Sequence, residues 1–149
     1  MKINSLNQLN KFSLKIASEI DLEDCIFLIG EIGVGKTTFV RYFINNLEKK
    51  NKLKKSQVLS PTFNIVYDYN VGSYKIMHYD LYRLRSKTEV KQLGIFEERE
   101  KSVKIIEWPQ LIKNTIKNKL EIHFSYSDKL NTRNIKILGT GKWKNFKLN

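Results

Sequence analysis

"GEIGVGKTT", residues 30–38, is the stretch that decides the fold. It matches the pattern G-x-x-x-x-G-K-[ST], whose fixed positions are occupied by Gly30, Gly35, Lys36 and Thr37. Glycines in this pattern let the backbone wrap a phosphate with its N–H groups. The lysine reaches the outer phosphates, and the hydroxyl binds Mg²⁺. The stretch therefore predicts a nucleotide-binding loop.

The residues on either side of the loop agree with this prediction. The apolar run "CIFLIG", residues 25–30, predicts a buried strand directly before it. The following residues, 36–50, predict a helix with one apolar face, made of Phe39, Phe43, Ile44 and Leu47. Cys25, the only cysteine, opens the strand and is interpreted as a small buried hydrophobe rather than a reactive thiol.

The rest of the chain alternates between helical and strand-like patterns. Helices are expected at 10–20, at 88–93 with Gly94 ending it, and at 110–119, and strands at 64–69, 73–80, 103–107, 120–126 and 133–139. This order predicts an α/β fold of the P-loop NTPase type, with three layers in which helices flank a mixed, mainly parallel sheet. The length of 149 residues predicts a single domain, residues 1–149.

Composition excludes several classes of protein. The chain has 41% hydrophobic and 28% charged residues, no stretch of about 18 apolar residues that would span a membrane, and no secretory signal at its start. We therefore expect a soluble, cytoplasmic protein. The net charge of +12 and the lysine-rich run "KKNKLKK", residues 49–55, leave two interpretations open: direct contact with RNA, or a solvated basic surface.

Two carboxylates stand where predicted strands end, Asp80 in "HYDLYR" and Glu107 in "IIEWP". Ligands gather at the carboxyl ends of strands in α/β sheets, so both can face the phosphates, one organising a metal ion and one positioning water. The sequence does not say which does which. Thr62, in "SPTF" at residues 60–63, is either a hydroxyl that senses the γ-phosphate or part of an ordinary turn.

Four further residues have two interpretations each. Arg83 either stabilises charge on the phosphates or forms a local salt bridge, and Trp108 either covers the nucleotide or a partner surface or is a buried aromatic. His78 and His123 are too isolated in the sequence to suggest a metal cluster, so we expect structural histidines.

The segments "GEIGVGKTT", "SPTFNIVYDY", "HYDLYRL", "LGIFE" and "IIEWPQ", in this order, closely resemble the TsaE family, also called YjeE. Its members are bacterial ATPases of threonylcarbamoyladenosine synthesis in tRNA, and the resemblance spans almost the whole chain. It implies binding of ATP and Mg²⁺, slow hydrolysis by the protein alone, and TsaD and TsaB as partners whose transferase activity the ATPase supports.

The resemblance also implies roles for individual residues. Asp80, Glu107 and Thr62 match residues of the catalytic site, and Thr37 and Glu107 match residues of the magnesium site. The expected nucleotide-binding residues are Glu31, Ile32, Gly33, Val34, Gly35, Lys36, Thr37 and Thr38, with Arg133 added from a looser match.

Three other functions compete with this one. A small-molecule kinase would need a lid, for which residues 49–55 are too short and too uniformly charged. A GTPase is disfavoured because "NKLE", residues 118–121, only faintly imitates the guanine-reading motif. The third alternative, a basic RNA-binding module, would hold its nucleotide only as a structural ligand.

Overall fold

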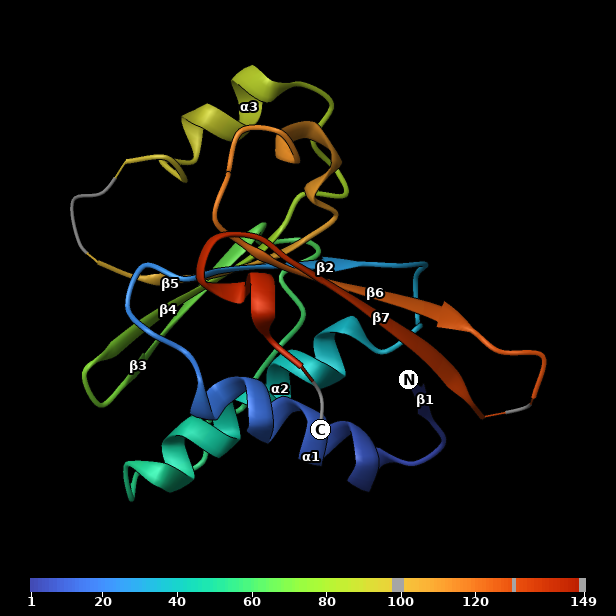
Figure 1. The fold of residues 1–149 in the computed structure, drawn as a ribbon. Helices are drawn as coiled ribbons and strands as arrows, with labels where there is room; N and C mark the ends of the chain where they lie inside the picture. Colours follow the sequence, from blue (N-terminus) through green and yellow to red (C-terminus); the bar gives the residue numbers. More distant parts are fainter. Residues whose placement is uncertain (98–100, 130, 148–149) are drawn as a thin grey trace.

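The computed structural model describes residues 1–97, 101–129 and 131–147 (Figure 1). Its strands form one seven-stranded sheet in the order β1-β7-β6-β2-β5-β4-β3. The strands are β1 (Lys2–Ile3), β2 (Cys25–Ile29), β3 (Val66–Val71), β4 (Tyr74–Asp80), β5 (Val103–Glu107), β6 (Leu120–Tyr126) and β7 (Arg133–Gly139). The helices are α1 (Leu6–Ser18), α2 (Lys36–Lys50) and α3 (Lys87–Gln92), with short 3₁₀ helices η1 (Pro109–Ile112) and η2 (Gly141–Asn145).

The sheet is parallel at its centre and antiparallel at both edges. β2 pairs in parallel with β5 and β6, and β4 pairs in parallel with β5. The edge pairs β3–β4, β6–β7 and β1–β7 are antiparallel. The expected mixed sheet is confirmed, and its parallel part is confined to the four central strands.

Helices cover both faces of the sheet, which confirms the predicted three layers. In Figure 1, α1 and α2 lie together below the sheet, and α3 lies above it. The side chains of β2 alternate accordingly: Ile26 and Leu28 belong to the core under α1 and α2, whereas Cys25 and Phe27 belong to the core on the opposite face. No helix within the described residues has the length and apolar character needed to cross a membrane.

Two predicted helices are confirmed with shifted ends. The first begins at Leu6 instead of residue 10, because the Ser5 side chain caps it by accepting a hydrogen bond from the Gln8 backbone N–H. Leu6 is 64% exposed and the next two residues are exposed polar side chains, so residues 6–8 add nothing to the apolar stripe that indicates a helix. The helix α3 lies within one residue of the predicted range and is followed by Gly94, which has a positive φ of 71°.

The helix expected over residues 110–119 is wrong. Only the 3₁₀ turn η1 forms there, and the chain then proceeds through turns to β6. The Lys119 ammonium group donates to the carbonyls of Lys113 and Ile116, at 3.0 and 2.8 Å, so a side chain satisfies acceptors that helical N–H groups would otherwise occupy. The elements β1 and η2 were not predicted, because they are too short to show a periodicity.

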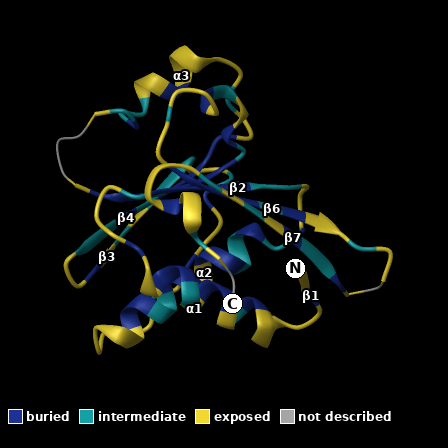
Figure 2. Cartoon of the chain, viewed as in Figure 1, coloured by how far each residue is buried: buried dark blue, intermediate teal, exposed yellow. Residues whose placement is uncertain are grey.

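The larger core lies between the sheet and the α1–α2 pair, where buried residues concentrate (Figure 2). Phe39 is its centre, with ring centroids of Phe12, Phe43 and Phe124 between 5.5 and 6.2 Å away. On the opposite face, Cys25 is buried as expected, and this burial raises the pKa of its thiol to about 12. A thiol with such a pKa remains protonated and unreactive at neutral pH.

Because one face of α2 is buried, truncating a side chain on that face should cause a large loss of stability. Leu47→Ala, at a position only 1% exposed, should lower the free energy of unfolding by about 2–5 kcal/mol. Leu14→Ala makes the same chemical change on α1 at a position 51% exposed, and should change it by less than about 0.5 kcal/mol. Urea unfolding followed by circular dichroism measures both, and equal losses would contradict the burial of Leu47 in the core.

Candidate functional site

The phosphate loop links β2 to the first turn of α2. Gly35 caps the helix with φ of 118°, a left-handed conformation that side-chain-bearing residues rarely adopt. Gly30, where the loop leaves the strand, has no room for a side chain, because a Cβ there would lie 2.5 Å from the Phe124 carbonyl oxygen. The loop therefore presents the unpaired N–H groups of a helix N-terminus, an arrangement that favours anions.

Lys36, the first residue of α2, is buried. Its ammonium group donates to the carbonyl oxygens of Gly30 and Glu31, both at 2.8 Å, and lies 4.5 Å from the centre of the Trp108 ring. Burial lowers the pKa of Lys36, and the nearby carboxylates of Glu107 and Asp80 act in the opposite direction. The lysine thus provides a positive charge beside the loop.

The two carboxylates predicted for the site lie near the ammonium group of Lys36. Asp80 ends β4 and Glu107 ends β5, and the parallel register pairs them directly with each other. Both are almost completely buried, at 4% and 3% exposure. The Thr37 hydroxyl donates to Glu107 Oε1 at 2.9 Å, which ties the start of α2 to the end of β5.

Thr62 reaches Asp80 from a separate segment of the chain. Its hydroxyl donates to Asp80 Oδ2 at 3.1 Å and lies 2.8 Å from the Ser60 hydroxyl. The other carboxylate oxygen, Oδ1, accepts the backbone N–H of Tyr82 at 3.0 Å. Because both oxygens of Asp80 are engaged, its carboxylate has one fixed orientation in the site.

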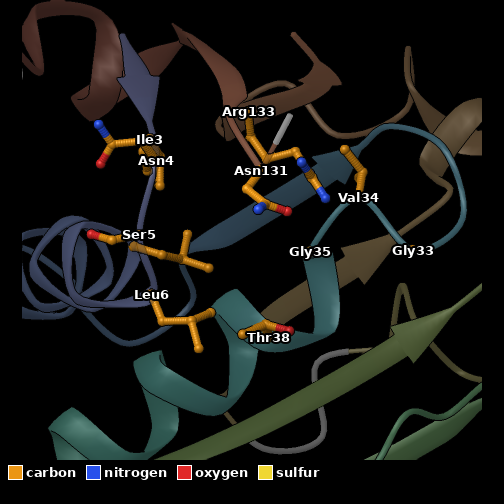
Figure 3. Close-up of a pocket in the computed structure, with 11 residues that line it drawn as sticks. Ile3, Asn4, Ser5, Leu6, Gly33, Val34, Gly35, Thr38, Asn131 and Arg133 are labelled. Carbon is orange, nitrogen blue, oxygen red and sulfur yellow. The ribbon is translucent and has the colours of Figure 1, made fainter. Parts of the chain in front are cut away.

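These groups line a small cavity of about 180 Å³. Its lining consists of Ile32, Gly33, Gly35, Lys36, Thr37, Thr38, Ser60, Thr62, Asp80, Glu107 and Trp108. A larger hollow of about 400 Å³ shares Gly33, Gly35 and Thr38 with it (Figure 3). This second hollow is bounded by β1, the start of α1, Val34, Asn131 and Arg133.

The expected nucleotide-binding residues therefore divide between two hollows. Arg133 lines the larger one, with its guanidinium 4.5 Å from the Tyr126 ring centre, and does not line the phosphate cavity. Tyr126 in turn donates its hydroxyl to the Ile32 carbonyl at 3.1 Å and so supports the loop. Glu31 contributes its carbonyl oxygen to the contact with Lys36.

The structure also places Arg83 and Trp108, for which two interpretations each were left open. Arg83 donates to the Phe63 carbonyl at 3.4 Å and, within the described chain, is not among the residues that line either hollow. Trp108 lines the phosphate cavity, is half-buried, and makes a tilted contact with the Tyr82 ring, whose centre is 4.8 Å away. A covering position over the cavity therefore describes Trp108 better than a core position.

His78, expected from the sequence as a structural histidine, makes a contact with the site that sequence reasoning did not predict. It is fully buried, and its Nε2 lies 2.9 Å from Glu107 Oε1. The sequence held one signal for this contact. His78 stands two residues before Asp80 on a strand, and this spacing puts both side chains on the same face of the sheet. His123 lies instead on β6 beside Glu121, with Nε2 to Oε2 at 3.0 Å.

The chemistry of these side chains fits Mg²⁺ bound together with phosphate. The hydroxyl of Thr37 and the carboxylate of Glu107 are oxygen donors, which this ion prefers. Across the described ranges no three His, Cys, Asp or Glu side chains are grouped as a metal cage would need. Mg²⁺ commonly takes one or two carboxylates and completes its shell with phosphates and water, so the site suits it without such a cage.

Comparison with known proteins agrees with the geometry. The model of the family described as "Threonylcarbamoyl adenosine biosynthesis protein TsaE" matches residues 3–135. The proteins of Rickettsia felis and Rickettsia conorii named "tRNA threonylcarbamoyladenosine biosynthesis protein TsaE" are 33% and 34% identical over 76% of this chain. The matched region spans 64% and 63% of their lengths, a little under two thirds. A protein of the same name from Borreliella burgdorferi is 29% identical over 95% of this chain and 94% of its own.

The fold has a match among solved structures. The crystal structure of YdiB from Bacillus subtilis superposes with a TM-score of 0.72 at 23% identity, covering 95% of this chain and 85% of YdiB. Together with the family match over most of its length, the phosphate loop and the converging carboxylates lead to one conclusion: the chain belongs to the TsaE family.

Proposed function

We propose that this chain binds ATP with Mg²⁺ and hydrolyses it in the cytoplasm, as a subunit of the machinery that makes threonylcarbamoyladenosine in tRNA. Its role there is to support turnover of the TsaD–TsaB transferase. One observation carries the proposal: Lys36, Thr37, Thr62, Asp80 and Glu107, which come from four separate segments, line one cavity at the phosphate loop. The names of the relatives support the pathway.

The two hollows hold different parts of the nucleotide. The phosphates lie against the loop, where Lys36 exchanges its contacts with the Gly30 and Glu31 carbonyls for phosphate oxygens. The nucleoside lies in the larger hollow, whose lining mixes apolar side chains such as Leu9 and Val34 with polar groups such as Arg133. Concave, mainly apolar sites with a few polar groups are typical of small-molecule binding.

The residues of the smaller cavity then have distinct tasks in hydrolysis. Bound Mg²⁺ would neutralise charge on the phosphates, and Thr37 and Glu107 would hold it. Because the Thr37 hydroxyl donates its hydrogen to Glu107, the lone pairs of its oxygen stay available to a cation. Asp80, held by Thr62 and by the Tyr82 N–H, orients the attacking water. The water oxygen bonds to the γ-phosphorus as the bond from that phosphorus to the bridging oxygen breaks. The electron pair of the broken bond stays on ADP, one proton of the water passes to a phosphate oxygen, and ADP and inorganic phosphate leave.

Removal of the loop lysine should abolish nucleotide binding. Lys36→Ala deletes the buried ammonium group beside the loop, so isothermal titration calorimetry with ADP and Mg²⁺ should detect no binding. Lys49→Ala, on an exposed lysine at the far end of the same helix, is the control and should bind as the wild type does. Undiminished binding by Lys36→Ala would contradict the assignment of the loop.

Substitution of the two carboxylates should affect different properties, the rate of hydrolysis for one and the Mg²⁺ dependence of nucleotide binding for the other. Asp80→Asn should lower the rate of ATP hydrolysis about 100-fold with little change in ADP affinity, because it alters the group that orients water. Glu107→Gln should raise the Mg²⁺ concentration needed for half-maximal nucleotide binding by about 10-fold or more, because it weakens the metal site.

Asp68→Asn provides the matched control for both carboxylates. It replaces an exposed carboxylate on the neighbouring strand β3 and should leave hydrolysis and Mg²⁺ dependence unchanged. Phosphate release and calorimetry measure these quantities, and wild-type behaviour of either site variant would show that its residue is misassigned.

The place in the pathway is tested by steady-state ATP hydrolysis with and without TsaD and TsaB from the same organism. We expect slow hydrolysis by the chain alone and a higher rate in the mixture. Equal, negligible rates in both samples would remove the ATPase-subunit proposal. Salt-sensitive binding of tRNA by the chain alone would instead favour the RNA-binding alternative.

A further inference from the structure

His78 is a buried polar side chain that the steps above do not use. It lies on β4 opposite Ile105 of β5 and Tyr67 of β3, and it has no measurable solvent exposure. Its Nε2 approaches Glu107 Oε1 at 2.9 Å, and its Nδ1 has no hydrogen-bond partner among the described residues. Burying the ring nitrogen Nδ1 without a hydrogen-bond partner costs free energy. The contact between Nε2 and Glu107 therefore has to account for a histidine at this position.

The chemistry of the pair fixes which nitrogen carries the hydrogen. An ionised carboxylate only accepts hydrogen bonds, so the 2.9 Å contact requires N–H at Nε2. In a neutral ring, Nδ1 is then the unprotonated nitrogen, which agrees with its lack of an acceptor nearby. The Nδ1–H form would instead point the Nε2 lone pair at the carboxylate and bury an unpaired N–H group.

The oxygen that His78 contacts is the same one that Thr37 uses. Glu107 Oε1 accepts the Thr37 hydroxyl and the His78 N–H, both at 2.9 Å, and the two donors come from different elements: the first turn of α2 and the interior of β4. With two donors on Oε1, rotation of the carboxylate would break two hydrogen bonds at once. The second oxygen, Oε2, is left free of both donors.

We infer that His78 is a positioning residue for the magnesium site, which holds the Glu107 carboxylate in the orientation that serves Thr37 and the metal ion. It touches neither nucleotide nor metal and acts through Glu107. The inference rests on the proposed function in one respect, the assignment of Glu107 to Mg²⁺. Groups that orient a ligating carboxylate in this way typically change metal affinity about 10–100-fold when removed.

The first test is the dependence of ADP binding on Mg²⁺. His78→Leu, which removes the N–H donor, should raise the half-saturating Mg²⁺ concentration about 10-fold or more while leaving ADP binding in EDTA unchanged. His78→Gln keeps an amide N–H that can reach Glu107 and should restore the Mg²⁺ dependence to near the wild-type value. A merely structural histidine would show no such rescue, since leucine fills the buried space at least as well as glutamine.

His123→Leu is the matched control, because His123 also bonds a glutamate through Nε2 but lies on β6 away from the cavity. It should leave the Mg²⁺ dependence unchanged. Wild-type Mg²⁺ dependence in folded His78→Leu, or equal defects in the Leu and Gln variants, would overturn the inference. These measurements do not require turnover, so an inactive wild-type protein would defeat the proposed hydrolysis without deciding the role of His78.

The second test needs neither metal nor nucleotide and still decides the matter if His78→Leu does not fold. Nitrogen-15 NMR of the histidine rings in the wild-type protein should show His78 protonated at Nε2 and bare at Nδ1. In Glu107→Gln the ring should lose its carboxylate acceptor, and its nitrogen signals should shift while those of His123 stay in place. A ring protonated at Nδ1 and bare at Nε2 in the wild type would overturn the inference.

Discussion

The register between β4 and β5 is the constraint on which the site depends. Parallel pairing sets Asp80 directly opposite Glu107, and the next strand, β2, pairs Leu28 with Glu107 just before the phosphate loop begins. A slip of one residue in either strand would turn its carboxylate to the other face of the sheet, away from Thr37. The alternating burial of these strands in two different cores opposes such a slip, so the packing of the sheet also fixes the geometry of the site.

A second constraint is the burial of three charged groups in a small volume. Lys36, Asp80 and Glu107 are all removed from water, which is costly unless each finds partners. Lys36 is satisfied by two carbonyls of the loop, and each carboxylate accepts two hydrogen bonds. The charges are therefore oriented before any ligand arrives. Such preorganised polar groups are what phosphoryl transfer requires, because little reorganisation remains for the reaction itself.

Sequence reasoning succeeded where the signal was local. The phosphate loop, its flanking strand and helix, and the strand ends that carry Asp80 and Glu107 follow from spacing and hydrophobic pattern, and the structure confirms that they meet. It failed over residues 110–119, where the Lys119 side chain satisfies carbonyls that a pattern assigns to a helix. It also missed the contact of His78 with Glu107, because that contact depends on which strands are neighbours and in what register.

The site has a fixed half and a less constrained half. Lys36, Thr37, Asp80 and Glu107 are held by α2 and by paired strands, whereas Thr62 belongs to a segment, residues 51–65, without helix or strand. That segment is joined to the sheet where the Asp80 N–H donates to the Ile65 carbonyl at 2.9 Å, while Phe63 at its tip remains 82% exposed. Under the proposed function the two halves separate binding from turnover. Under that proposal the strands and the loop hold the nucleotide, whereas the orientation of Asp80 depends also on Thr62. Displacement of the Thr62 segment would free the Asp80 carboxylate and would therefore change hydrolysis before it changes nucleotide binding.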